Sequence, residues 1–256
     1  MIRKIKAWRA KNSAGSAYAH LVGKDETALS DHFRTENAGR TGFNKVFCIG
    51  DNKTGTTSIE AVFRNLGLHV PKQSHQERLT SHVLTSGRYD ALVRFVRNFD
   101  AFQDAPFSQE SLYIALDASF PNSKFILTLR EPNAWFDSLL GFHQKFFGFE
   151  GSGAPEMSFW SGKKHLHENY TFEQMKRIAT QVRNGRITID WGRLYDRDAR
   201  ISAFNERNDA IIRYFRDRPS DLLCIDLAEE ADTTKICRFL GFDDQHIQDF
   251  PRLNAR

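Results

Sequence analysis

Residues 45–58, KVFCIGDNKTGTTS, limit the possible folds of this chain more than any other segment. The first six residues form a short apolar run that ends in glycine, which is typical of a buried parallel strand. From Thr56 onward, apolar side chains recur at helical spacing, so a helix should follow. A strand, a loop containing Gly50 and Gly55, and a helix together favour phosphate binding. Loop amides and a helix N-terminus then point at the same anion.

The remaining chain continues the alternation of strands and helices. Apolar runs predict buried strands at residues 124–129 and 222–227, and weaker signals indicate short strands near 68–70 and 100–103. Helical periodicity predicts helices over residues 56–66, 89–99, 109–120, 132–143, 172–182, 199–215 and 233–240. This order predicts an α/β protein with a P-loop-like three-layer fold, in which helices flank a central parallel sheet. We expect residues 45–254 to form a single domain and residues 1–44 an N-terminal arm or extension.

Composition excludes several classes of protein. A net charge of +4 is too small and dispersed for nucleic-acid binding and suits an anionic small ligand. The three cysteines form no C-x-x-C pair, which predicts buried, reduced thiols in a cytoplasmic protein. No apolar run reaches the roughly 18 residues that a membrane span needs. We also expect no signal peptide, because the basic start is not followed by an apolar stretch.

The loop departs from the nucleotide-kinase pattern G-x-x-x-x-G-K-[ST] at one position. Gly50 and Gly55 have the required spacing, but Thr56 stands where a kinase has its lysine. The lysine of this loop, Lys53, lies three residues earlier. We therefore interpret the loop as a phosphate loop adapted to a different transferred group. A glycine-containing turn capped by threonines is the structural alternative.

A second phosphate element follows the strand at 124–129. Arg130 ends that strand, and Ser138 comes eight residues later on the next predicted helix. An arginine at the carboxyl end of a parallel strand lies at the ligand-binding edge of an open sheet. A guanidinium with a hydroxyl nearby suits a phosphate monoester. The alternative is a surface ion pair with Glu131.

These two segments resemble the sulfotransferase superfamily. Residues 53–58 (KTGTTS) resemble its 5′-phosphosulfate loop, K-[ST]-G-[ST]-[ST], and residues 120–132 (FPNSKFILTLREP) resemble its 3′-phosphate motif. Residues 222–227, 237–241 and 250–254 are similar as well. The resemblance covers roughly residues 45–254 and is closest to bacterial-type and carbohydrate-type members. The sequence departs from the family in one respect. Cytosolic aryl and steroid members have an Arg-Lys-Gly triplet near their C-terminus, and this triplet is not found here. Residues 161–164, or Arg183 and Arg186, are candidates to replace it.

The resemblance implies a donor and a set of binding residues. The donor is 3′-phosphoadenosine 5′-phosphosulfate, and the product is 3′,5′-bisphosphoadenosine. Lys53 would contact the bridging oxygen and the sulfuryl group, and Arg130 and Ser138 the 3′-phosphate. The residues expected at the 5′-phosphate are Thr54, Gly55, Thr56, Thr57 and Ser58. The acceptor would be a small molecule, a carbohydrate or a lipid with a hydroxyl or amine, and its identity does not follow from the sequence. Nor does the oligomeric state.

The expected reaction is an in-line displacement with no metal ion, in which Lys53 is the catalytic charge stabiliser and Asp104 the general base. Asp104 lies in a segment, Asp-Ala-Pro, that resembles the D-x-P element of bacterial-type members. Its structural alternative is a turn or helix-cap carboxylate. The next candidates for the base are Asp100, His69 and His75, and His143 is more typical of a structural residue. The aromatic cluster at residues 142–160 is either core or the wall of an acceptor pocket.

Two other functions remain open at this point. A P-loop kinase for a small molecule would need a lysine at Thr56 and Mg²⁺. A non-catalytic nucleotide-binding protein of the same fold would have lost the reactive groups, although Lys53, Arg130 and Ser138 are all present.

Overall fold

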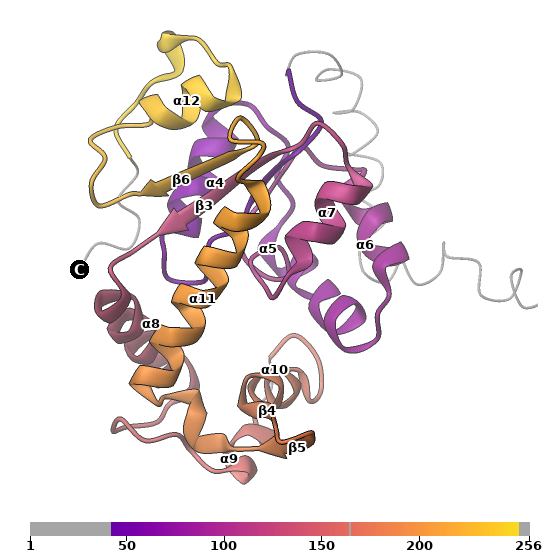
Figure 1. Ribbon diagram of the computed structural model, residues 1–256, viewed down its shortest axis with the longest axis vertical. Helices are drawn as coiled ribbons and strands as arrows, with labels where there is room; N and C mark the ends of the chain where they lie inside the picture. The colour runs from indigo at the N-terminus through magenta and orange to yellow at the C-terminus, as the bar shows by residue number, and fades with distance from the viewer. Residues whose placement is uncertain (1–41, 164, 251–256) are drawn as a thin grey trace, which may run out of the picture.

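A four-stranded parallel sheet forms the centre of the protein in the computed structural model, which describes residues 42–163 and 165–250. The strands lie in the order β2-β1-β3-β6. Their bounds are Ala101–Phe102, Val46–Cys48, Lys124–Leu129 and Leu222–Asp226, respectively. Every neighbouring pair is parallel. The sheet and its helices confirm the predicted α/β fold with a central parallel sheet (Figure 1).

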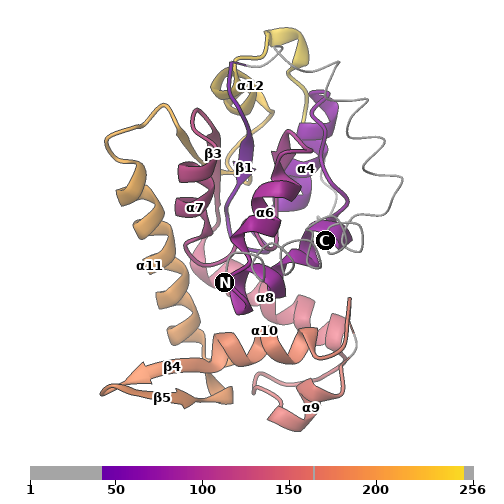
Figure 2. The ribbon, with the colours of Figure 1, turned by 90° about the vertical axis from the view of Figure 1, so that its right-hand side faces the viewer.

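The two faces of the sheet carry separate apolar clusters, because successive side chains of a strand point to opposite faces. Phe47 and Ile49 pack with α6 (Tyr89–Val96), α7 (Leu112–Ser119) and α11 (Arg197–Phe215). Val46 and Cys48 pack with α4 (Thr56–Asn65) and α12 (Thr234–Leu240) on the other side. Helices therefore flank both faces, as Figures 1 and 2 show.

A third apolar cluster lies beyond the carboxyl ends of the strands. It joins α8 (Pro132–Phe147), α9 (Met157–Ser161), α10 (Tyr170–Ala179) and the first half of α11. The antiparallel hairpin of β4 (Thr180–Arg183) and β5 (Arg186–Ile189) continues from α10. A 3₁₀ turn, η2 (Trp191–Leu194), leads from it into α11. Figure 2 shows α10 and the hairpin below the sheet. Trp135 of this cluster hydrogen-bonds the Asn52 carbonyl, so the cluster contacts the loop that follows β1.

Several local predictions need correction. The expected strand near residues 68–70 is an irregular segment, although Leu68 and Val70 are buried. The helix expected from residue 109 begins at Leu112. The helix expected over 172–182 ends at Ala179, and the chain then enters the β4–β5 hairpin. The sequence interpretation also missed α5 (Gln73–Glu77), the π-helical turn η1 (Ser81–Thr85) and α9.

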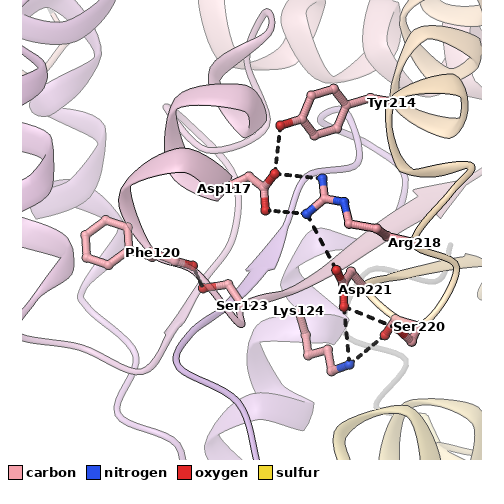
Figure 3. A network of polar contacts seen from close by, with 8 residues as sticks. All are labelled: Asp117, Phe120, Ser123, Lys124, Tyr214, Arg218, Ser220 and Asp221. Carbon is pink, nitrogen blue, oxygen red and sulfur yellow. Dashed lines mark hydrogen bonds and ion pairs between the residues drawn. The ribbon is translucent and has the colours of Figure 1, made fainter.

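A polar network fixes the amino end of the sheet (Figure 3). Asp117 on α7 accepts two hydrogen bonds from the Arg218 guanidinium, at 3.0 and 2.7 Å, and one from the Tyr214 hydroxyl at 2.7 Å. Lys124 at the start of β3 donates to the Ser220 carbonyl at 2.6 Å and lies 3.7 Å from Asp221. The network ties α7 to the end of α11 and to the segment that precedes β6.

The cysteines follow the prediction only in part. All three are free thiols; Cys48 and Cys237 are buried, but Cys224 is exposed. Cys224 lies on β6, the last strand in the sheet order, where the side chains are mostly half-buried. Within the described part of the chain, no helix is long and apolar enough to cross a membrane. The predicted N-terminal arm falls outside the described residues up to residue 41, as do residues 251–254 of the resemblance.

Candidate functional site

The loop between β1 and α4 is held in shape by its two glycines. A Cβ on Gly50 would lie 1.9 Å from Thr128 Oγ1 on β3, so only glycine fits there. Gly55 is the N-cap of α4 with φ 100°, and a Cβ there would lie 2.6 Å from Leu227 Cδ1. Lys53 also has a positive φ, 73°. No described side chain caps α4, and uncapped amides at a helix start are suited to an anion.

The hydroxyl residues of the loop have different surroundings. Thr54 is buried; its hydroxyl donates to the Asp51 carbonyl at 2.6 Å and lies 2.5 Å from Thr128 Oγ1. Thr56 is buried at the first position of α4, whereas Thr57 is exposed. Ser58 is half-buried, and its amide donates to the Gly55 carbonyl. The Thr54 hydroxyl therefore fixes the loop on β3, and the backbone and the first turn of α4 offer the donors for a phosphate.

Arg130 lies against this loop. Its Nη1 donates to the Lys53 carbonyl at 2.9 Å, so the two predicted phosphate elements are in direct contact. Glu131 instead caps α8, because its carboxylate accepts hydrogen bonds from the amides of Asn133 and Ala134. The Glu131 carboxylate therefore serves as a helix cap rather than as the ion-pair partner of Arg130.

One stripe of α8 faces the loop. Trp135 Nε1 donates to the Asn52 carbonyl at 3.0 Å, and the Lys53 ammonium lies 4.4 Å from the centre of the Phe142 ring. Ser138 is half-buried and lies between these residues along the same stripe, at i+3 from Trp135 and i−4 from Phe142. The helix thus places Ser138 on the side that contacts the loop.

Asp104 occupies the turn after β2. Its Oδ1 accepts from the Ala105 amide at 2.7 Å, and its Oδ2 accepts from Gln73 Nε2 at 2.9 Å. Burial raises the pKa of Asp104 to about 6; the hydrogen bond from Ala105 opposes this rise, and the nearby carboxylates of Glu77 and Asp51 add to it. Because α7 begins only at Leu112, Asp104 is not the cap of that helix. Its φ of 60° is a left-handed value, which is unusual for a residue with a side chain.

The other candidate bases differ in their surroundings. Asp100 accepts from the His69 amide at 2.9 Å, and the His69 ring packs 4.7 Å from that of Phe99. His143 on α8 shares a hydrogen bond of 2.9 Å with the Tyr195 hydroxyl. Burial, followed by the positive charges of Arg200 and Lys53, lowers the pKa of His143 to about 3. His143 is thus neutral and lies close to the Lys53 charge. His75 lies on α5.

The aromatic cluster divides into core and surface. Trp160 is fully buried, whereas Phe142 and Phe146 are exposed and stack with their centroids 5.5 Å apart. The candidates for the missing triplet lie elsewhere. Arg183 and Arg186 are exposed on the β4–β5 hairpin. Lys163 donates to the Phe147 carbonyl at 2.5 Å, and residue 164 is outside the described residues.

Sequence reasoning missed three arginines: Arg200 and Arg207 on α11, which lie near the loop, and Arg177 on α10, which is connected to Arg207 through Glu110. Arg207 Nη2 donates to the carbonyl of Ile49, the residue before Gly50, at 3.0 Å. A signal was present, because Arg200 and Arg207 share a face of α11 with the buried Phe204 and Ile211. Charged residues on the apolar face of a helix are unusual and point to a specific partner.

In the described residues, no three His, Cys, Asp or Glu side chains gather to hold a metal ion. A family model described as "Sulfotransferase domain" matches residues 45–256 of the chain. A search of curated proteins finds no match.

Proposed function

The chain belongs to the sulfotransferase domain family, and we propose that it transfers a sulfuryl group from 3′-phosphoadenosine 5′-phosphosulfate to a hydroxyl or amine. The acceptor would be a small molecule, a carbohydrate or a lipid. One observation carries the choice of donor: Arg130 hydrogen-bonds the Lys53 carbonyl. The loop that would bind the 5′-phosphate and the guanidinium that would bind the 3′-phosphate therefore belong to one site. A donor that carries phosphates at both positions requires such an arrangement.

The residues of the loop fit this donor. The amides at the start of α4 and the positive φ values of Lys53 and Gly55 make a concave set of donors, which suits a 5′-phosphate. Arg130 can reach a 3′-phosphate with the guanidinium atoms that do not bind the Lys53 carbonyl. Ser138 would add a hydroxyl from the α8 stripe. Thr54 supports the loop through Thr128 and takes part through its backbone.

The chain's own groups supply the remaining chemistry. When bound, the donor provides an activated sulfuryl group with a phosphate as its leaving group. The Lys53 ammonium stabilises the charge that develops on the leaving oxygen, and the Phe142 ring orients that ammonium. Asp104 accepts the proton of the acceptor. A pKa of about 6 keeps this carboxylate mostly ionised at pH 7 and still basic enough to take a proton.

Finer assignments belong to the same proposal. We take residues 45–254 as the catalytic domain of a bacterial-type or carbohydrate-type member. The exposed pair Phe142 and Phe146 would form part of the acceptor wall. The free thiols of the described chain fit a cytoplasmic enzyme.

Thermal unfolding with competing nucleotides tests the proposal. A ligand that binds only the folded protein raises its melting temperature, by an amount equivalent to about 2.7 kcal/mol at one hundred times its Kd. We expect 3′,5′-bisphosphoadenosine to stabilise the protein at micromolar concentrations and ATP with Mg²⁺ to do so far less. Equal or greater stabilisation by ATP with Mg²⁺ would support a kinase and contradict the proposal.

A further inference from the structure

Helix α11 directs two arginines inward, beside the start of the donor loop. Arg200 and Arg207 are seven residues apart and therefore lie on one face of the helix, two turns apart. Phe204 lies between them and stacks on the Trp135 ring, with centroids 4.2 Å apart. This stacking fixes the helix against α8, so the two guanidiniums are held on a rigid surface.

Arg207 is only partly satisfied by its neighbours. Its Nη2 donates to the Ile49 carbonyl at 3.0 Å, and its Nε donates to the Glu110 carbonyl at 3.2 Å. Its Nη1 is buried and has no hydrogen-bond partner among the described residues. Burial lowers the pKa of the guanidinium, although the carboxylates of Asp51 and Glu110 oppose this effect.

Arg200 also has an unpartnered donor. Its Nε is buried without a hydrogen-bond partner in the described chain, and its guanidinium lies 5.7 Å from the centre of the Trp135 ring. Burial lowers its pKa, with Asp51 the largest opposing charge. Arg200 as a whole is half-buried, but its Nε is a charged donor that is removed from water without an acceptor, which is unfavourable for folding.

Arg177 on α10 completes the group. Its Nη2 donates to the amide oxygens of Gln109 and Gln174, and its Nη1 lies 3.2 Å from Glu110 Oε1. Its Nε is buried without a partner among the described side chains. Glu110 therefore connects the two arginines: its carboxylate pairs with Arg177, and its backbone carbonyl accepts a hydrogen bond from Arg207.

The charges in this region do not balance. The carboxylates of Asp51 and Glu110 act on Arg200 and Arg207, and Glu110 also acts on Arg177, while Arg193 adds a further positive charge beside Arg200. The Glu110 side chain is 60% exposed, so solvent screening weakens its attraction. The excess positive charge therefore lies around Glu110, which contacts Arg177 and Arg207, and extends along α11 to Arg200. An additional anion would satisfy both the charge and the unpartnered N–H donors.

The group lies next to the reacting centre. Arg207 binds the carbonyl that precedes Gly50, and Arg200 lies over Trp135, whose indole binds the Asn52 carbonyl. The positive charges of Arg200 and Lys53 both lower the pKa of His143, which places both charges in the neighbourhood of this imidazole. An acceptor held at Arg200 would place its reactive group near Lys53.

We propose that Arg200 and Arg207, supported by Arg177, form a subsite for an anionic group of the acceptor. The enzyme would then sulfate a molecule that already carries a carboxylate, phosphate or sulfate group. This inference rests on the proposed function and narrows it to one chemical class of acceptor. The subsite is separate from the donor residues Lys53 and Arg130, so it makes its own prediction.

Binding of matched probes to the full chain saturated with 3′,5′-bisphosphoadenosine tests the inference. The probes are 4-nitrophenyl glucosides that differ only at C6: hydroxymethyl, carboxylate, phosphate ester or sulfate ester. Their Kd values are measured by thermal shift for the wild type, Arg200→Gln and the control Arg213→Gln. Arg213 lies on the same helix and is exposed. The three anionic probes also show which anion the subsite prefers.

We expect at least one anionic probe to bind the wild type about tenfold or more tightly than the neutral probe, as hydrogen bonds to charged groups predict. Arg200→Gln should reduce this advantage to about threefold or less, while Arg213→Gln keeps it. Bisphosphoadenosine affinity should stay within about twofold in both variants. Equal binding of all four probes to the wild type would overturn the inference even if Arg200→Gln did not fold.

Two further results separate this inference from the proposed function. If Arg200→Gln weakened bisphosphoadenosine as much as it weakened the anionic probe, Arg200 would belong to the donor site and the inference would be wrong. If the wild type did not bind bisphosphoadenosine, the proposed donor would be wrong. The same probes measured without nucleotide would then decide whether the anionic subsite exists.

Discussion

Replacing Asp104 by asparagine should change how stability depends on pH, in a direction that its burial determines. The folded protein raises the pKa of this carboxyl from 3.8 to about 6, chiefly by burial. Between these values the folded state binds a proton that the unfolded state has lost, so the free energy of unfolding falls as pH rises. A tenfold change in acidity corresponds to about 1.4 kcal/mol, which gives a penalty of about 3 kcal/mol above pH 6.

Asparagine removes this penalty, because it does not ionise. Its amide oxygen can keep the hydrogen bond from the Ala105 amide, and any change in the bond from Gln73 is the same at every pH. The free energy of unfolding of the wild type and of Asp104→Asn is measured in urea at pH 4, 5, 6, 7 and 8. The pH-dependent part of the difference between them reports the ionisation of Asp104. Asp104→Asn should gain about 2.4 kcal/mol relative to the wild type between pH 4 and pH 7, because the unfolded carboxyl is already more than half ionised at pH 4.

The same variant should lose activity while it gains stability. Removal of a general base lowers turnover by about 10²–10⁴-fold, and bisphosphoadenosine should still bind. Wild-type turnover should rise with pH through about 6, as the carboxyl becomes ionised. A stability difference that stayed constant from pH 4 to pH 8 would refute the claim that Asp104 ionises against its burial. Unchanged turnover would remove it as the base.

Three further substitutions test separate parts of the account. Lys53→Ala should lower kcat by roughly 10²–10³-fold with little change in bisphosphoadenosine affinity; loss of affinity alone, with kcat intact, would contradict its role at the leaving oxygen. Gly50→Ala should lower the free energy of unfolding by about 2 kcal/mol or more, measured in urea, because the new methyl group would overlap Thr128. A neutral result would mean that the loop is not packed on β3. Burial alone would raise the pKa of Asp117, but the hydrogen bonds from Arg218 and Tyr214 hold it below its usual value. Asp117→Asn should therefore cost about 2 kcal/mol at pH 7 and progressively less as pH falls below about 4, whereas a loss independent of pH would exclude the ion pair as its cause.

The central part of the fold could be predicted from the sequence because it depends on local patterns. Residues 124–129 (KFILTL) are largely apolar, and they are the strand in full. The loop at residues 50–58 has glycines where the backbone needs them: Gly55 adopts φ 100°, and Gly50 packs on Thr128. Such positions are specified by sterics within a few residues, so a single sequence reveals them.

Other features depend on tertiary context. The periodicity of residues 172–182 favours a helix, yet the chain turns at Asn184 and Gly185, both with positive φ, to form a hairpin. Asn-Gly is the signal of such a turn, and it follows the predicted helix, at residues 184 and 185. Arg200 and Arg207 on α11 belonged to a predicted helix, but their burial depends on α8 and the donor loop, which no local pattern encodes.

Non-glycine residues with a left-handed backbone recur around the site. Lys53, Asp104 and Glu110 all have positive φ, at 73°, 60° and 45°. Each such residue costs roughly 1–3 kcal/mol unless its surroundings hold it in place. Their positions coincide with the proposed charge stabiliser, the proposed base and the glutamate that contacts Arg177 through its carboxylate and Arg207 through its backbone carbonyl. This distribution agrees with a site whose geometry is maintained at the expense of stability.

The contribution of Arg130 to recognition of the 3′-phosphate tests the account most directly. Calorimetry would compare 3′,5′-bisphosphoadenosine with adenosine 5′-phosphate, which lacks the 3′-phosphate, on the wild type, on Arg130→Ala and on the control Arg213→Ala. Removing one partner of a buried charged pair costs about 2–4 kcal/mol, or roughly 30–1,000-fold in Kd. We expect the wild type and the control to prefer bisphosphoadenosine by that factor and Arg130→Ala to bind both ligands nearly equally. An undiminished preference in Arg130→Ala, or none in the wild type, would contradict the proposed donor site.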